Sequence, residues 1–134
     1  MTQEDKKLLI KDLCARLPYD TVCQVEFKSD GRYESKNMIL SGIFKDEAYF
    51  TIENGSVYSN DYKPYLFPLP SMTEEQSKEL DEIDPEFYSL ICENGDRYVS
   101  MDVRSYDWFN KNHFDYRGLI EKGLAIDATG LNIY

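Results

Sequence analysis

The sequence predicts an α+β domain: a small curled antiparallel β-sheet or an SH3-like barrel, packed with an N-terminal helix, an acidic middle helix and two short C-terminal helices. Three observations predict it. Apolar residues recur at helical spacing near the start of the chain, alternate with polar residues between positions 19 and 62, and recur at helical spacing near the end. At 134 residues the chain has the usual length of one domain, so residues 1–134 are expected to form a single domain.

An amphipathic helix is predicted over residues 3–17. Thr2 followed by Asp5 is typical of a helix N-cap with an acid in the first turn, and Pro18 marks the end. The apolar side of this helix is expected to carry Leu9, Ile10, Leu13, Cys14 and Leu17, and the solvated side Lys6, Lys7, Lys11 and Asp12.

Short antiparallel strands joined by hairpins are predicted next, over residues 22–27, 38–44, 48–52 and 56–58. Turn residues at Ser29–Asp30–Gly31 and at Asn54–Gly55 separate them. Prolines at 64, 68 and 70 then keep residues 63–70 extended. Because apolar residues separate these prolines, a buried strap over the sheet is favoured over a proline-rich ligand for a partner's groove.

The second half of the chain contains helical patterns around one candidate strand pair. A helix over 74–83 follows Ser71 or Thr73 as N-cap, and residues 87–103 resemble a hairpin. Ser105 is expected to cap a helix ending near 112, and Asp115 to cap another. The stripe of that last helix, which Gly123 ends at positive φ, is Tyr116, Leu119, Ile120 and Leu124.

Composition excludes several classes of function. The net charge of −10 is concentrated in residues 73–86, and the basic residues 28, 32, 36 and 45 are interleaved with acids, so direct nucleic-acid binding is not expected. One histidine and three scattered cysteines do not make a zinc site, and no glycine pattern cradles a phosphate, so neither a metal nor a cofactor is predicted. The unpaired cysteines and the lack of a long apolar run favour a cytoplasmic protein without a membrane segment.

Residues 108–124 hold the only tryptophan and the only histidine of the chain. Trp108, His113, Tyr116 and Arg117 are candidates for binding a partner, because Trp, Tyr and Arg dominate interface energetics. The alternative, which we favour for the rings, is that they fill the joint between the C-terminal helices and the sheet. His113 with Asp115, or with a cysteine, would also make an acid/base or thiol pair. The apolar settings of the cysteines and the capping role of Asp115 argue against this, and no catalytic residue is predicted.

Three segments carry a resemblance to a known set of proteins: LLIKDLCARLPY at 8–19, KPYLFPLPSMTEEQ at 63–76 and NHFDYRGLIEKGLAIDATGLNIY at 112–134. Together they cover about 50 of 134 residues, and they resemble proteins of unknown function encoded by gut Bacteroidetes, their phages and related mobile elements. Residues 85–103 depart from the pattern. The resemblance implies an intracellular, accessory, phage-linked protein and implies no activity.

The sequence is therefore compatible with three functions. The first is a non-enzymatic protein-interaction or accessory module of phage or mobile-element origin, with another protein as its partner. The second is an acidic inhibitor that mimics nucleic acid and blocks a host defence protein, which the acids of residues 73–86 motivate. The third is a small hydrolase that uses His113.

Overall fold

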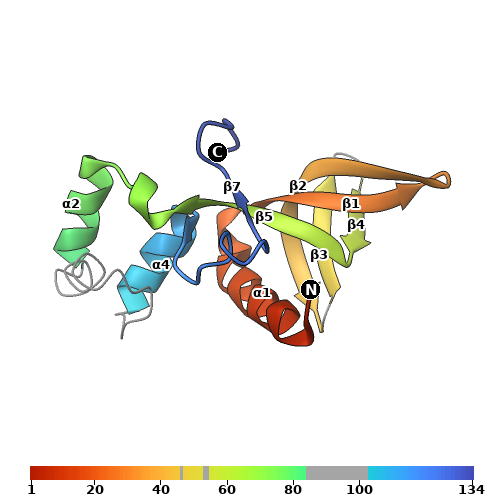
Figure 1. The fold of residues 1–134 in the computed structure, drawn as a ribbon, viewed down its shortest axis with the longest axis horizontal. Helices are drawn as coiled ribbons and strands as arrows, with labels where there is room; N and C mark the ends of the chain where they lie inside the picture. The colour runs from red at the N-terminus through yellow and green to blue at the C-terminus, as the bar shows by residue number, and fades with distance from the viewer. Residues whose placement is uncertain (46, 53–54, 84–102) are drawn as a thin grey trace.

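The computed structural model describes residues 1–45, 47–52, 55–83 and 103–134. They form an α+β fold, which confirms the predicted class (Figure 1). The helices are α1 (Gln3–Arg16), α2 (Glu74–Ile83) and α4 (Val103–Lys111). The strands are β1 (Val22–Ser29), β2 (Arg32–Phe44), β3 (Glu47–Ile52), β4 (Gly55–Ser59), β5 (Asp61–Pro68), β6 (Phe114–Asp115) and β7 (Ile126–Asp127). None of the helices in the described ranges is long and apolar enough to cross a membrane.

The strands form one mixed sheet in the order β4-β3-β2-β1-β5-β6, and β7 also pairs with β5. The pairs formed among β1 to β5 are all antiparallel. β6 and β7 pair with β5 in parallel. Only Asn60 separates β4 from β5, although β4 is the first strand of the order and β5 lies beyond β1. The sheet must therefore curl, and the Ser59 hydroxyl donates to the Glu26 carbonyl of β1 at 2.7 Å. Among the described strands the sheet stays open, so a closed SH3-like barrel is not what forms.

Local sequence signals explain the N-terminal half. Thr2 and Asp5 form a reciprocal capping box at the start of α1, as the sequence indicates. Asp30 and Gly31 both have positive φ, at 50° and 78°, which suits the tight turn between β1 and β2. The predicted strands are confirmed, and β2 is longer than expected because it begins at Arg32. Residues 63–68 are extended as predicted, but they belong to β5 within the sheet rather than to a strap over it, and residues 69–70 lie in the 3-10 helix Leu69–Ser71.

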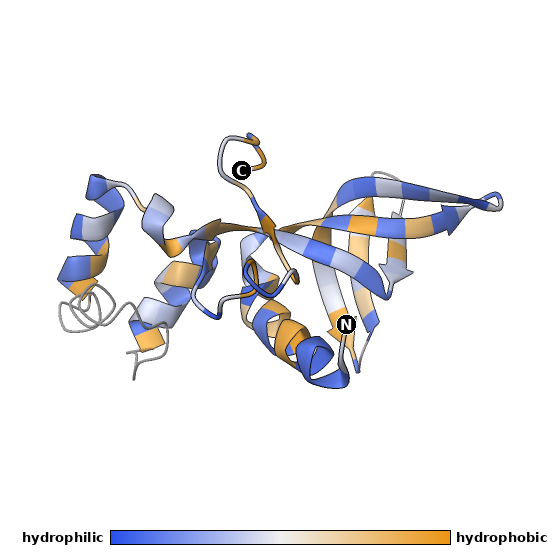
Figure 2. Cartoon of the chain, in the orientation of Figure 1, coloured by the Kyte–Doolittle hydropathy of each residue, from blue (hydrophilic) through white to orange (hydrophobic). Residues whose placement is uncertain are grey.

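Two apolar clusters hold the fold together. In the first, α1 packs on the inner face of the sheet through Leu9, Leu13, Cys23, Val25, Met38, Leu40, Ala48 and Phe50, together with Leu119 and Leu124 of the C-terminal segment. In the second, α2, α4 and β6 meet through Leu80, Trp108, Phe109, Phe114 and Tyr116. Figure 2 shows the apolar side of α1 as a run of orange segments, and Figure 1 shows α2 and α4 beside the sheet rather than beneath it.

The C-terminal predictions need three corrections. α4 begins at Val103, so Ser105 is a buried residue inside the helix and not its cap. The predicted helix after Asp115 does not form, because residues 116–125 are turns in which Gly118 and Gly123 have φ of 76° and 74°. A right-handed helix cannot continue through such residues. The predicted hairpin at 87–103 lies, apart from its last residue, outside the described residues.

Candidate functional site: a buried charged cluster between α1 and the C-terminal segment

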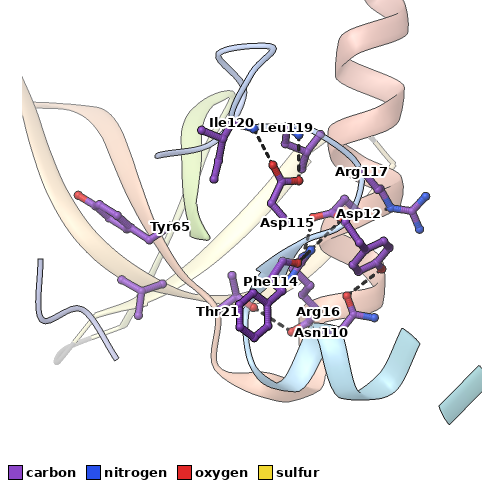
Figure 3. A network of polar contacts seen from close by, with 12 residues as sticks. Asp12, Arg16, Thr21, Tyr65, Asn110, Phe114, Asp115, Arg117, Leu119 and Ile120 are labelled. Atoms are coloured by element: carbon purple, nitrogen blue, oxygen red, sulfur yellow. Dashed lines mark hydrogen bonds and ion pairs between the residues drawn. The ribbon is translucent and has the colours of Figure 1, made fainter. Parts of the chain in front are cut away.

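The cluster is centred on an ion pair inside α1. Asp12 and Arg16 lie one helical turn apart, and both side chains are fully buried. Nε of Arg16 donates to Oδ2 of Asp12 at 2.7 Å, and Nη2 donates to Oδ1 at 3.2 Å. Nη2 also donates to the carbonyl of Phe114 in β6 at 2.7 Å, which ties α1 to the C-terminal segment (Figure 3). The prediction that Asp12 is solvated is wrong, because the C-terminal segment covers that side of α1.

Arg117 brings a second guanidinium to the same carboxylate. Its Nε donates to Oδ1 of Asp12 at 3.2 Å, and its side chain keeps 21% of its surface exposed. The ring of Tyr116 lies 5.2 Å from Cζ of Arg16 and 5.0 Å from Cζ of Arg117, within the range of cation–π attraction. The Tyr116 hydroxyl donates to Oδ1 of Asn110 at 2.8 Å. Burial raises the pKa of this hydroxyl, so it stays protonated.

Asp115 is the second buried carboxylate. Oδ1 accepts from the amide of Leu119 and Oδ2 from the amide of Ile120, both at 2.9 Å. Asp115 therefore binds two free amides, as predicted, but it does not cap a helix, because the helix predicted after it is absent and the amides belong to a turn. Figure 3 shows the carboxylate directed at these two amides. Among the described residues Nδ1 of His113 has no hydrogen-bond partner, so Asp115 does not orient this nitrogen.

His113 has an unusual backbone and an unusual environment. Its φ is 62°, a left-handed conformation that costs a non-glycine residue free energy, and its carbonyl accepts from the amide of Phe67 in β5 at 2.8 Å. Its ring stacks on Tyr134, with centroids 3.6 Å apart and planes 10° apart. Burial, and then the nearby charge of Arg16, lower the pKa of His113 to about 4. The imidazole is therefore neutral at pH 7.

The thiol of Cys23 lies in the same region but is not poised to react. Cys23 is fully buried, and burial raises the pKa of its thiol far more than the Arg16 charge lowers it. A protonated thiol and a neutral imidazole do not make the thiolate–imidazolium pair that thiol catalysis uses. Within the described ranges, no group of three or more His, Cys, Asp or Glu side chains is placed to hold a metal ion.

Trp108 belongs to the second apolar cluster and not to the charged one. It is 6% exposed, stacks on Phe114 with a centroid distance of 5.6 Å, and donates from Nε1 to Oε1 of Glu79 at 3.0 Å. Of the four candidate residues, Trp108 and Tyr116 are buried, which agrees with the packing interpretation of the rings, and His113 and Arg117 are partly exposed. Sequence reasoning missed Arg16, for which an Asp and an Arg four positions apart on α1 were the available signal.

Comparison of the chain with protein-family models, with curated proteins and with solved structures finds no significant match. Function is therefore inferred from the residues and their arrangement.

Proposed function

We propose that the protein is a non-enzymatic protein-interaction module that binds its partner with the outer face of β2, β3 and β4. Residues alternate between the two faces of a strand. Met38, Leu40, Ala48 and Phe50 are buried against α1, so the residues between them face outward. This outward surface, called the outer patch below, consists of Ile39, Phe44, Tyr49 and Tyr58.

The outer patch is apolar and open to solvent, and this observation carries the proposal. Ile39, Phe44 and Tyr58 are 42%, 63% and 58% exposed. Tyr49 and Tyr58 pair across β3 and β4 with ring centroids 6.1 Å apart. Neighbouring exposed apolar side chains mark interaction sites, and aromatic residues are enriched in the cores of protein interfaces.

Two features beside the outer patch support a protein partner. A groove runs past it, with Val22, Ile39, Thr51 and Ile52 among its lining residues. β4 ends the strand order of the described sheet, and its sequence GSVYS contains neither charge nor proline to block strand pairing. An extended segment of a partner would gain main-chain hydrogen bonds along β4 and aromatic contacts from the outer patch.

The other two functions have less support. A hydrolase that uses His113 would need a base or nucleophile activated beside the imidazole, whereas both oxygens of Asp115 are bound elsewhere and the Cys23 thiol stays protonated. A nucleic-acid mimic would need negative charge spread over an extended face. The described acids of that stretch lie on the ten residues of α2, and one of them, Glu79, is bonded to Trp108.

The setting of this interaction is also part of the proposal. The resemblance of residues 8–19, 63–76 and 112–134 to proteins of Bacteroidetes phages and mobile elements supports an accessory factor that acts in the cytoplasm.

Substitutions in the outer patch test the proposal. Tagged wild-type protein, Phe44→Glu and Tyr58→Glu would be used to capture partners from an extract of the native host. A protein that is captured would then be purified, and its Kd measured. Tyr33→Glu is the matched control, because Tyr33 is 83% exposed on β2 but lies outside the outer patch.

We expect the two patch variants to bind at least ~10-fold more weakly, which is about 1.4 kcal/mol, and the control to bind like the wild type. Equal binding by all four proteins would contradict the proposal.

A further inference from the structure

Two buried polar atoms of the charged cluster have no hydrogen-bond partner among the described residues: Nη1 of Arg16 and Nδ1 of His113. The Arg16 side chain is fully buried, so water does not solvate Nη1 in this conformation. A buried charged donor left unpaired is unfavourable, and native proteins retain few of them. Nη1 can only donate, so the group that would satisfy it must present an oxygen lone pair.

The two atoms belong to one region of the molecule. Nη2 of Arg16 donates to the carbonyl of Phe114, the residue that directly follows His113. This bond holds the guanidinium next to the backbone that carries the imidazole. The charge of Arg16 also acts on His113, where it opposes protonation.

The four charged side chains of the cluster balance, since Arg16 and Arg117 oppose Asp12 and Asp115, but the two guanidinium groups share one carboxylate as their acceptor. The other carboxylate at this junction, Asp115, is directed at the amides of Leu119 and Ile120 (Figure 3). A small monoanion would therefore complement the two guanidinium groups without displacing a bond already made.

We propose that Arg16 and His113 form a binding site for a small carboxylate, and that the ring of Tyr134 is its cover. One carboxylate oxygen accepts from Nη1 of Arg16. The other accepts from Nδ1 of His113 in the tautomer that carries its proton there, since a neutral imidazole has one N–H. Carboxylates suit this role because a guanidinium binds them with short, charge-assisted hydrogen bonds.

The ring of Tyr134 is placed to cover the imidazole of His113. This ring stacks on His113, and the Tyr134 hydroxyl accepts from the amide of Val22 at 3.0 Å and donates to the carbonyl of Tyr65 at 2.8 Å. The β1–β5 ladder ends at Cys23 and Pro64, so the hydroxyl bridges the two strands where they separate. Leu131 and Asn132 are exposed, and Ile133, directly before Tyr134, is half-buried. Moving Tyr134 aside breaks its ring contacts with His113 and Phe67 and its hydrogen bonds with Val22 and Tyr65.

His113 provides a direct probe, because it is the only histidine in the sequence and its imidazole gives unique NMR signals. Sodium acetate would replace sodium chloride at constant ionic strength and pH 7 in the full chain. We expect a saturable shift of the His113 signals. We also expect the pKa of His113 to rise from about 4, because a bound anion stabilises the protonated ring. No shift, or a shift that grows linearly without saturation, would overturn the site.

Variants that keep Arg16 distinguish acetate binding at this site from nonspecific attraction of acetate to positive charge. Arg117→Gln removes one of the two guanidinium groups that share Asp12 and should weaken acetate binding several-fold. Lys122→Gln is the matched control, since it removes the same charge from an exposed position in the following turn and should leave the Kd unchanged. Equal weakening by both variants would refute a specific site.

The cover is tested by Tyr134→Phe, which keeps the stacked ring and removes the hydroxyl. Acetate should bind this variant several-fold more tightly, because the ring of residue 134 is no longer held to Val22 and Tyr65 and moves away from His113 more easily. An unchanged Kd would refute the role of Tyr134 as a cover.

Discussion

Replacing Asp12 by leucine tests whether the buried ion pair is a structural necessity. The carboxylate accepts three hydrogen bonds, two from Arg16 at 2.7 and 3.2 Å and one from Arg117 at 3.2 Å. Leucine has the same branched shape as aspartate and is somewhat larger, so the change removes charge without opening a cavity. Arg16 would keep only its bond to the Phe114 carbonyl, as a fully buried cation. Breaking a buried pair in this way costs about 3–5 kcal/mol. Loss of the Arg117–Asp12 bond adds little to this free-energy cost, because the Arg117 side chain is partly exposed and can be solvated by water.

The assay is urea denaturation followed by the fluorescence of Trp108, the only tryptophan, which is buried against Phe114 and becomes exposed on unfolding. Asp12→Leu should lower the free energy of unfolding by about 3–5 kcal/mol. The double variant Asp12→Leu/Arg16→Met should recover to within about 2 kcal/mol of the wild type, because it replaces the pair by apolar groups instead of breaking it. Lys11→Leu, at an exposed position of α1, controls for the added leucine.

A loss below about 1 kcal/mol for Asp12→Leu would refute the argument, since such a value belongs to surface pairs. A double variant as unstable as the sum of its single changes would refute it as well, because the two side chains would then act independently.

Three further outcomes are expected. The pKa of His113 is about 4 in the folded protein against 6.5 as the ordinary value, so the unfolded chain binds the proton first and stability falls as pH drops from 6.5 to 4. Since the ring is partly exposed, the wild type should lose about 2 kcal/mol more than His113→Asn over that range in urea titrations. Asp115→Ala leaves one buried and one half-buried amide without a partner, so it should lower the free energy of unfolding by about 2–4 kcal/mol in thermal denaturation. Asp127→Ala frees one exposed amide and should lower it by under about 1 kcal/mol; equal losses would contradict this. Gly123→Ala meets no atom within 4 Å but must hold φ at 74°, so it should cost about 1–2 kcal/mol, and Gly42→Ala, equally uncrowded and without a positive φ, should cost less.

The elements that sequence reasoning predicted well are those that local interactions determine. The capping box of α1 and the Asp30–Gly31 turn each depend on residues within a few positions of one another. The middle helix follows the same logic, because Thr73 accepts from the amide of Gln76 and the Gln76 side chain accepts from the amide of Thr73. Patterns of this kind are visible in a short window of sequence.

The elements that sequence reasoning missed depend on contacts between distant segments. An acid on α1 is normally solvated, and Asp12 is buried only because Phe114 and Arg117 meet that side of the helix. The apolar spacing after Asp115 matches a helix, but those residues point into the core from turns. β6 and β7 contain two residues each, too few to show any alternation. The bonds of Tyr134 to Val22 and Tyr65 have no sequence pattern at all.

β5 pairs with β1, β6 and β7, and this arrangement affects the order in which the chain folds. β1 to β4 pair with their neighbours in sequence, whereas β6 and β7 reach β5 only by closing long loops. Closing a long loop costs chain entropy before any contact offsets it, so local hairpins form early and such pairings form late. The C-terminal segment, with His113 and Tyr134, would then dock onto a sheet already assembled. Substitutions there should mainly speed unfolding, and those in the β1–β2 hairpin should slow folding.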